Sequence, residues 1–408
     1  MSTSPYAAVE TPVRTPWLAV TAVGMATFSV VTTEMLPVGL LTPIADTLDT
    51  STGTAGLMIS LPALLAALFA PLVVIVSGNL DRRKILCGLL SLLVIANIAS
   101  ALAQNMTWML AARVLVGFCM GGIWAIAGGL ASRLVPARSI GLATSIIFGG
   151  VAAASVLGVP LGAQIGAFAG WRWAFGVMAL FSGLVLALHL AVIPALPAAS
   201  AATLLQFGKQ LRKRQLQAGL LLTLLLVTSH FVAFTFVRPL LLSVSGVDAQ
   251  WLGALLFFYG CAGIIGNFLA GIVAVRRTAP TIIAISAGLL LTPLLFLTVG
   301  DSSIGGGVVL LAWGLAYGGV SVGLMTLMMK AAPRAVEIVA ALYVGVFNMA
   351  IALGAWAGGQ AVDRLGLSAN LWLAAGFATA ALLLSSGISF VEHRRKAGVG
   401  ADCRQNDW

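Results

Sequence analysis

The stretch that decides the fold is WLAVTAVGMATFSVVTTEMLPVGLLT, residues 17–42. It is apolar for long enough to cross a bilayer as one helix, which takes about 20 residues, yet it carries an acid, Glu34, in its interior. The polar segment 1–16 before it is short, and the apolar run extends well past the length of a signal peptide without a convincing cleavage site. We therefore interpret 17–42 as a first membrane-spanning helix that contains a carboxyl group.

The rest of the chain has the composition of a membrane protein. Of its 408 residues, 60% are hydrophobic and 8% are charged, whereas soluble domains are about 45–50% apolar and about 25% charged. The net charge of +10 does not indicate nucleic acid, because the basic residues form short clusters between apolar runs. We find no nucleophile–base pair, phosphate-binding loop or metal-ligand spacing, and the four cysteines are scattered. We expect neither an enzyme nor a bound cofactor or metal.

Twelve apolar runs of spanning length follow one another along the chain. They are continuous and lack the ten-residue alternating pattern of barrel strands. The sequence therefore predicts an all-α membrane protein with 12 transmembrane helices. The expected spans are 17–42, 54–77, 85–104, 106–131, 140–166, 173–195, 216–243, 250–275, 279–299, 304–329, 338–361 and 370–391.

The basic residues lie mainly on one side of this array. If the N-terminus is cytoplasmic, 18 of the 22 Lys and Arg fall in cytoplasmic segments, and only Arg172 and Arg364 fall in outer loops. Because cytoplasmic loops are enriched in positive charge, we predict cytoplasmic N- and C-termini in a bacterial inner membrane. The 18 are Arg14, Arg82, Arg83, Lys84, Arg133, Arg138, Lys209, Arg212, Lys213, Arg214, Arg276, Arg277, Lys330, Arg334, Arg394, Arg395, Lys396 and Arg404; the outer loops instead carry the acids Asp46, Asp49, Asp248, Asp301 and Asp363.

The spans divide into two sets of six. The longest loop, 196–215, holds the densest basic cluster and separates a unit at 17–195 from one at 216–391, with tails at 1–16 and 392–408. Several residues recur in the second unit at an offset of about 195 positions. A duplicated unit predicts two pseudo-symmetric six-helix bundles with a site near the midplane between them. The matching pairs are Arg82–Arg83 with Arg276–Arg277, Pro43 with Pro239, Gly158 with Gly354, and Gly162 with Gly358.

Short motifs in these positions resemble those of the major facilitator superfamily. Residues 78–84, GNLDRRK, resemble a shortened form of its loop motif between the second and third helices. Arg113-x-x-x-Gly117-x-x-x-Gly121 resembles its fourth-helix motif, and GVPLG at 158–162 is similar to the fifth-helix signature of its drug:proton antiporters, with Pro160 displaced by one position. WRWAF at 171–175 resembles the entry to its sixth helix.

Two further stretches favour a subgroup of that antiporter branch. TTEMLPVGLL at 32–41 and FTFVRP at 234–239 are most similar to sugar-efflux and purine-ribonucleoside-efflux exporters. The resemblance covers roughly 17–391. It implies the major facilitator fold and proton-coupled efflux of small molecules by alternating access.

Three charged side chains lie within the expected spans: Glu34, Arg113 and Arg238. Charges are costly in a bilayer and should face a cavity or a partner. At a rise of 1.5 Å per residue, Glu34 lies about 13 Å and Arg113 about 10 Å from the outer ends of their spans, so the two could meet. One hypothesis is that Glu34 is the proton-coupling carboxylate and Arg113 tunes its pKa. The alternative is a permanent ion pair that only holds the helices together.

His230 and Arg238 are further candidates for the site. His230 occupies the position that repeats Glu34 in the second half, and it is expected to relay protons or bind substrate, or to be satisfied by a neighbouring helix. Arg238 precedes Pro239 and is expected to attract an anionic or hydroxyl-rich substrate, or to extend to the outer headgroups.

Aromatic and amide side chains in the spans are candidates for substrate contacts. Rings can stack on a sugar or base and amides can hydrogen-bond its edges, although most such residues in spans simply pack. Asn348 is the strongest of them, because an amide in the middle of an apolar helix needs a partner. The candidates are Trp124, Tyr259, Asn267, Trp313, Tyr317, Tyr343 and Asn348.

Glycines and one loop are expected to serve conformational change. Small residues spaced four apart let helices approach closely, so Gly158, Gly162, Gly354 and Gly358, with a bend at Pro160, are predicted at the interface on which the halves rock. The resemblance further implies that Asp81, Arg82 and Arg83 close the inner face.

Three readings of function remain open at this point. An exporter that exchanges protons for small molecules is favoured by the fifth-helix motif. A proton-coupled importer of the same fold and a membrane sensor or channel are the alternatives. In each case we expect a monomer in the lipid bilayer, with a small-molecule substrate, protons and no nucleic acid.

Overall fold

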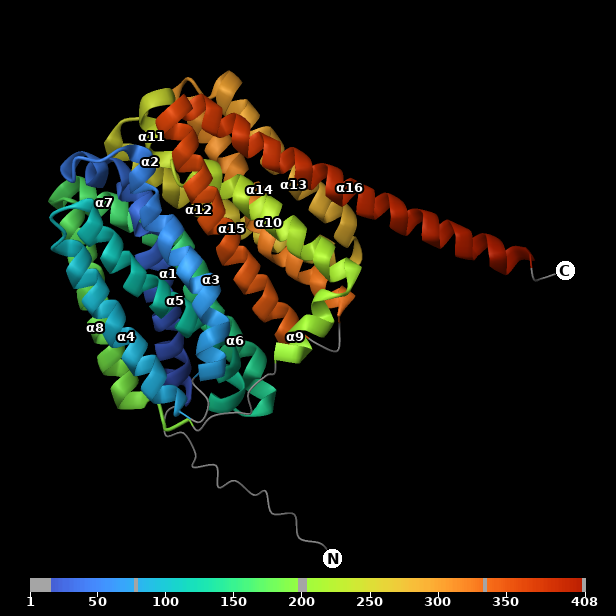
Figure 1. Ribbon diagram of the computed structural model, residues 1–408, viewed down its shortest axis with the longest axis horizontal. Helices are drawn as coiled ribbons and strands as arrows, with labels where there is room; N and C mark the ends of the chain where they lie inside the picture. Colours follow the sequence, from blue (N-terminus) through green and yellow to red (C-terminus); the bar gives the residue numbers. More distant parts are fainter. Residues whose placement is uncertain (1–15, 77–79, 197–203, 333–335, 406–408) are drawn as a thin grey trace, which may run out of the picture.

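The computed structural model describes residues 16–76, 80–196, 204–332 and 336–405. Most of the N-terminal tail 1–16, the first residues of the motif at 78–84, and part of the linker 196–215 lie outside these ranges. The described residues form helices joined by short connections (Figure 1). Twelve of these helices are long and apolar enough to cross a membrane. This confirms the predicted fold class and the twelve predicted spans.

The first half of the chain forms a bundle that we call the N bundle, comprising α1 to α8. Its elements are α1 (Pro16–Thr47), α2 (Thr52–Ala55), α3 (Leu57–Val76), α4 (Arg82–Ala101), α5 (Met106–Leu134), η1 (Ala137–Ser139), α6 (Ile140–Ala153), η2 (Ala154–Gly158), α7 (Val159–Ala169) and α8 (Trp171–Val192).

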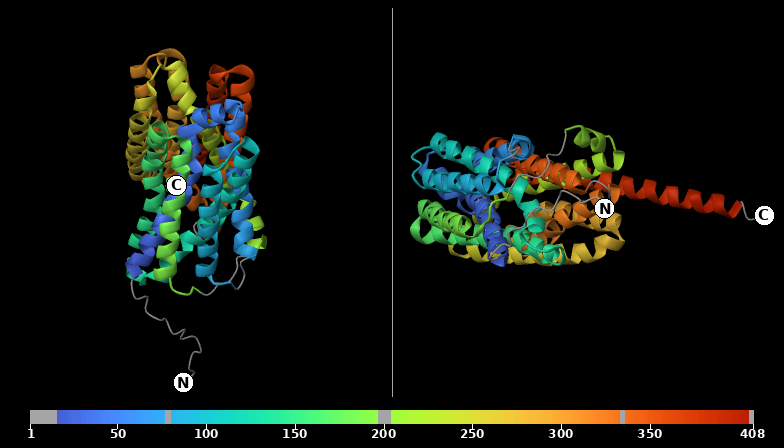
Figure 2. Two further views of the ribbon diagram at one scale, coloured as in Figure 1. Left: turned by 90° about the vertical axis from the view of Figure 1, so that its left-hand side faces the viewer. Right: turned by 90° about the horizontal axis from the view of Figure 1, so that it is seen from below.

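The second half forms the C bundle, comprising α10 to α16, and lies beside the first (Figures 1 and 2). A short helix that the sequence did not predict, α9 (Leu204–Leu211), stands in the linker. The C-bundle elements are α10 (Arg214–Phe234), α11 (Val237–Pro239), η3 (Leu240–Val244), α12 (Ala249–Arg276), α13 (Thr278–Val299), α14 (Ser303–Ala331), α15 (Val336–Leu365) and α16 (Leu367–Gln405).

Two spans are interrupted where the sequence predicted continuous helices. The fifth consists of α6, a π-helical turn η2, and α7. Pro160 has no N–H to donate to the carbonyl of Val156, so the backbone relaxes into wider turns just before it. The seventh span ends as α10 at Phe234 and resumes at Val237 next to Pro239, followed by the π-helical η3.

The two ends of the molecule differ in charge. We call the end with Arg82–Lys84 and Arg276–Arg277 the basic end, and the end with Asp248, Asp301 and Asp363 the acidic end. The bundles pack together in the half nearer the acidic end: α11 contacts α1, α15 contacts α2 and α3, and α12 contacts η2 and α7. Because α12 contacts the part of the fifth span beyond α6, this seam runs from mid-span to the acidic end.

The glycines predicted at the rocking interface lie elsewhere, and this expectation is corrected. Gly158 and Gly162 face Thr32 and Leu36 of α1, inside the N bundle. Gly354 and Gly358 likewise face the backbone of α10, inside the C bundle. A four-residue spacing identifies a close helix contact but does not say which neighbour makes it.

Beside the fifth span, the close approach between the bundles instead uses glycines of α12. A Cβ atom on Gly260 would lie 2.7 Å from the Cα of Val156 in η2, and one on Gly253 would lie 3.3 Å from the carbonyl oxygen of Pro160. Pro160, predicted at a moving contact, therefore does face the opposite bundle.

Candidate functional site

Glu34 lies at mid-span in α1 with only 1% of its surface exposed. Its Oε1 atom has no hydrogen-bond partner among the described residues. Among those residues it also forms no ion pair with Arg113, so the predicted pair is absent from this structure. A buried carboxyl without a cation is costly in its charged form. Glu34 is therefore a buried acid that the described residues leave without a counter-charge.

Arg113 in α5 is fully buried and binds the neighbour of Glu34 instead. Its Nη1 donates to the carbonyl oxygen of Thr33 at 2.9 Å, and its Nη2 donates to Ser100 Oγ at 2.7 Å. The guanidinium also lies over the Phe175 ring, 4.8 Å from its centroid. These contacts fix the charge against the side of α1 that Thr33 occupies.

A buried polar cluster surrounds this contact and was not identified from the sequence. Asn97 of α4 donates from Nδ2 to Thr33 Oγ1 at 3.1 Å and to Ser182 Oγ at 3.4 Å. Ser182 in turn hydrogen-bonds Ser29, one turn before Thr33, at 2.8 Å. Asn97 is an amide inside an apolar span, the same signal that singled out Asn348, and could have been found by it.

In the C bundle, His230 of α10 lies in a stack of aromatic rings. Its imidazole stacks on Tyr317, with centroids 3.4 Å apart and planes inclined by 11°. Phe234 follows on the stack at 4.7 Å from His230, and Tyr259 follows at 4.8 Å from Phe234. Trp313 meets His230 edge-on at 5.4 Å. Rings from α10, α12 and α14 thus form one cluster in the C bundle.

His230 is held mainly by these rings. The Tyr259 hydroxyl lies 3.5 Å from its Nε2, and its Nδ1 has no hydrogen-bond partner among the described residues.

The remaining predicted contacts lie at different places. Asn348 is buried in α15, where Nδ2 donates to the Val344 carbonyl and Oδ1 has no partner among the described residues. Trp124 lies in the N bundle beside Phe148, with ring centroids 5.9 Å apart. Asn267 is exposed. It lies two turns along α12 from Gly260, on the same face of the helix. Its face is the one that meets the N bundle nearer the acidic end.

Arg238 lies four residues beyond Phe234, nearer the acidic end. Its Nη1 donates to the carbonyl oxygen of Gly39 in α1 at 2.8 Å. It therefore connects the two bundles in this structure, where the sequence suggested a substrate contact or a headgroup contact.

The loop residues Asp81, Arg82 and Arg83 contact the end of the sixth span. Asp81 Oδ1 accepts from the backbone N–H of Arg83 and of Leu196, both at 2.8 Å. Arg83 Nη2 donates to the Leu190 carbonyl at 2.6 Å, and the Arg82 N–H donates to the Leu196 carbonyl at 2.9 Å. These bonds stay within the N bundle.

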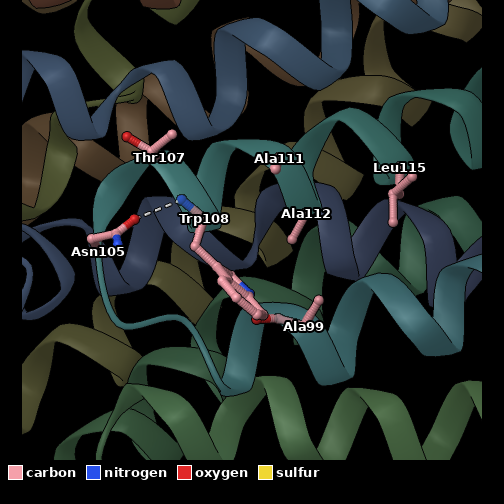
Figure 3. Close-up of a pocket in the computed structure, with 7 residues that line it drawn as sticks. All are labelled: Ala99, Asn105, Thr107, Trp108, Ala111, Ala112 and Leu115. Carbon is pink, nitrogen blue, oxygen red and sulfur yellow. Dashed lines mark hydrogen bonds between the residues drawn. The ribbon is translucent and has the colours of Figure 1, made fainter.

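A cavity of about 640 Å³ lies apart from this site, on α4 and α5 near the acidic end (Figure 3). It contains none of the predicted substrate contacts, and Asn105 accepts from the Trp108 N–H beside it. No group of three His, Cys, Asp or Glu that could hold a metal occurs among the described residues. The buried acid and the ring cluster remain the candidate site. The cavity is lined by Ala99, Asn105, Thr107, Trp108, Ala111, Ala112 and Leu115.

Comparison with known proteins identifies the family. Residues 23–355 match the Major Facilitator Superfamily. The chain is similar to a bacterial homolog of the human lysosomal transporter Spinster, solved in two inward-facing conformations. The TM-score is 0.72 for the occupied form, with 16% identity over 94% of this chain and 97% of that one. It is 0.71 for the unoccupied form, with 15% identity over 93% and 96%.

A third solved structure has the same fold. The human organic anion transporter MFSD10 (TETRAN) matches with a TM-score of 0.63 and 20% identity, over 91% of this chain and 99% of that one. The family match covers most of the chain and agrees with the twelve helices in two bundles. The chain therefore belongs to the major facilitator superfamily, whose members are secondary transporters that work by alternating access.

Proposed function

We propose that this transporter exports small ring-bearing molecules in exchange for protons, as in the drug:proton antiporter branch. The observation that carries the proposal is Glu34: an acid that is buried at mid-span, has no cation bound to it among the described residues, and belongs to a helix, α1, that contacts α11 of the C bundle. An acid in this position can hold a proton while it is sealed from water, and exchange it when a path opens.

Arg113 supports this role by its placement. Its Nη1 and Nη2 donate to Thr33 and Ser100 and not to Glu34, so Glu34 has no counter-charge bound to it in this structure. A fixed ion pair would make protonation of Glu34 difficult, because the cation would stabilise the charged carboxylate. The separation favours proton coupling over a purely structural bridge.

The ring cluster supports a substrate with a flat or cyclic core. Tyr317, Tyr259, Trp313 and Phe234 present aromatic surface around His230. Aromatic faces pack well against planar rings and against the apolar faces of sugars. Sugars, nucleosides and amphenicol-type drugs all satisfy this description, and we propose Asn348 and Trp124 as hydrogen-bonding groups for them.

We also propose that the basic end faces the cytoplasm of a bacterial cell, with both termini on that side. The concentration of Lys and Arg at this end supports the orientation. The bundles pack together from mid-span to the acidic end. In this orientation the structure corresponds to a state that is closed toward the outside.

Transport into inside-out membrane vesicles tests the direction and the coupling. Vesicles with an acidic interior would be given a labelled pentose, a purine nucleoside and an amphenicol, each alone. We expect at least one compound to accumulate, and the accumulation to collapse when a protonophore removes the pH gradient.

The same vesicles separate the competing functions. A symporter would show the opposite dependence, with accumulation only when the outer solution is the acidic one. Accumulation that ignores the gradient, or a flux that merely equilibrates, would reject proton-driven export.

A further inference from the structure

A carboxylate of the C bundle binds the start of the second span in the N bundle at the acidic end. Asp363, two residues before the end of α15, accepts a hydrogen bond from the Gly53 N–H to Oδ1 at 2.7 Å. Its Oδ2 accepts from Ser51 Oγ at 2.5 Å. Ser51 is also the N-cap of α2, where its Oγ accepts from the Thr54 N–H at 3.0 Å.

The backbone comes unusually close at the same place. A Cβ atom on Gly53 would overlap the Gly359 carbonyl oxygen and the Asp363 carboxylate. One on Gly359 would lie 2.7 Å from the Gly53 carbonyl oxygen. Glycine at both positions is therefore what allows α15 to approach α2 closely enough for the two hydrogen bonds to form.

These bonds depend on the conformation of the transporter. Hydrogen bonds to a charged acceptor are stronger than bonds between neutral groups. Their donors and acceptor belong to different bundles, so both bonds must break when the acidic end opens. The other side-chain hydrogen bonds between the bundles in the described part of the chain differ, because Arg238 and Ser60 both donate to neutral backbone carbonyls, of Gly39 and Ala352.

We propose that Asp363, Ser51, Gly53 and Gly359 form a latch that holds the acidic end closed and sets the balance between the two transport states. The two hydrogen bonds of the latch stabilise the closed state only. Weakening it favours the state in which the acidic end is open, whatever the substrate and whatever drives transport. The latch is thus independent of the proton coupling proposed above.

Distances between spin labels across the acidic end test the latch. Thr107 of the N bundle and Asp301 of the C bundle are both exposed at that end. They would be replaced by labelled cysteines in an otherwise cysteine-free full-length chain in lipid nanodiscs. We expect Asp363→Asn to raise the ratio of long to short distances about tenfold, which corresponds to about 1.4 kcal/mol. Ser51→Ala removes one of the two bonds and should have a smaller effect in the same direction.

Two matched variants control for charge and for glycine replacement. Asp248→Asn removes an exposed acid at the same end, whose side chain makes no capping hydrogen bond. Gly376→Ala adds a methyl group where no atom lies within 4 Å. Gly53→Ala, in contrast, should shift the distances at least as far as Asp363→Asn, because its methyl group overlaps the opposite bundle.

The result that would overturn the latch is a distance distribution in Asp363→Asn and Gly53→Ala that matches the two control variants. If Asp363→Asn fails to fold, Gly53→Ala and Ser51→Ala decide the question by the same comparison. A shift toward shorter distances in Gly53→Ala or Ser51→Ala would equally reject the proposal.

Discussion

Thr33 and Glu34 are neighbours in α1 but have different surroundings. Successive residues of an α-helix point about 100° apart. Thr33 is held from one side by Asn97 and Arg113, through its hydroxyl and its carbonyl. These hydrogen bonds fix the rotation of α1 about its axis, and with it the direction in which Glu34 points. The polar cluster of the N bundle therefore positions the acid without binding it.

Replacing Asn97 with Ala should destabilise the protein. The substitution removes two hydrogen bonds and leaves the buried hydroxyls of Thr33 and Ser182 with fewer partners, which costs about 1–3 kcal/mol. Thermal melting in detergent should show the loss, and Gln250→Ala, an exposed amide, should melt like the wild type. An Asn97→Ala protein as stable as the wild type would show that the cluster does not hold α1.

Tyr317 should contribute to substrate binding through its ring more than through its hydroxyl. An aromatic contact is worth about 0.5–1.5 kcal/mol beyond its buried area. For a compound found to be transported, we expect Tyr317→Leu to raise KM up to about tenfold and Tyr317→Phe to leave it within about twofold. Equal values of KM for the two variants would argue against stacking as the source of affinity.

At the scale of elements, the seam between α12 and the fifth span depends on small residues. Gly260 faces η2, the π-helical turn that precedes Pro160, and Gly253 faces Pro160 itself. The break in the fifth span therefore lies opposite two glycines, whose lack of a side chain leaves room for its backbone. We expect this seam to open and close during transport, since it joins one bundle to the other.

Gly260→Ala should slow transport. Its methyl carbon would lie 2.7 Å from the Cα of Val156, so the seam closes only if backbone shifts. We expect the turnover rate to fall severalfold while the melting temperature changes little. Gly271→Ala on the same helix is the control, because its methyl group meets only Val322 at an ordinary 3.5 Å. Wild-type turnover in Gly260→Ala would exclude a tight seam.

The sequence was sufficient to predict the spanning helices, because a helix that crosses lipid requires a long apolar run, and such runs are visible directly in the sequence. It was not sufficient for the interruptions at η2 and η3 or for the short α9, which depend on local backbone geometry. The Glu34–Arg113 pair shows a second limit. Counting residues gave the depth of each group along its helix, but the rotation of α1 is set by contacts such as Asn97–Thr33, which depend on tertiary packing. The same limit misplaced the glycine contacts.

At the scale of the whole molecule, the two ends differ in charge, and both bundles have Lys and Arg at the basic end. This asymmetry should fix the orientation in the membrane. In a cysteine-free chain, Asp301→Cys should react with a membrane-impermeant maleimide in intact cells, and Lys84→Cys should react only after the cells are made permeable. Labelling in the reverse pattern would show that the topology is the opposite one, with the acidic end in the cytoplasm.

The central claim is that a proton on Glu34 drives the movement of substrate, and Glu34→Gln tests it most directly. Glutamine keeps the size of the side chain and removes its exchangeable acid. The measurement is made in proteoliposomes with a compound that the wild type transports, as accumulation under a pH gradient and as counterflow without one. We predict that Glu34→Gln keeps counterflow and loses accumulation, while Asp301→Asn keeps both. Gradient-driven accumulation at the wild-type level in Glu34→Gln would contradict the account.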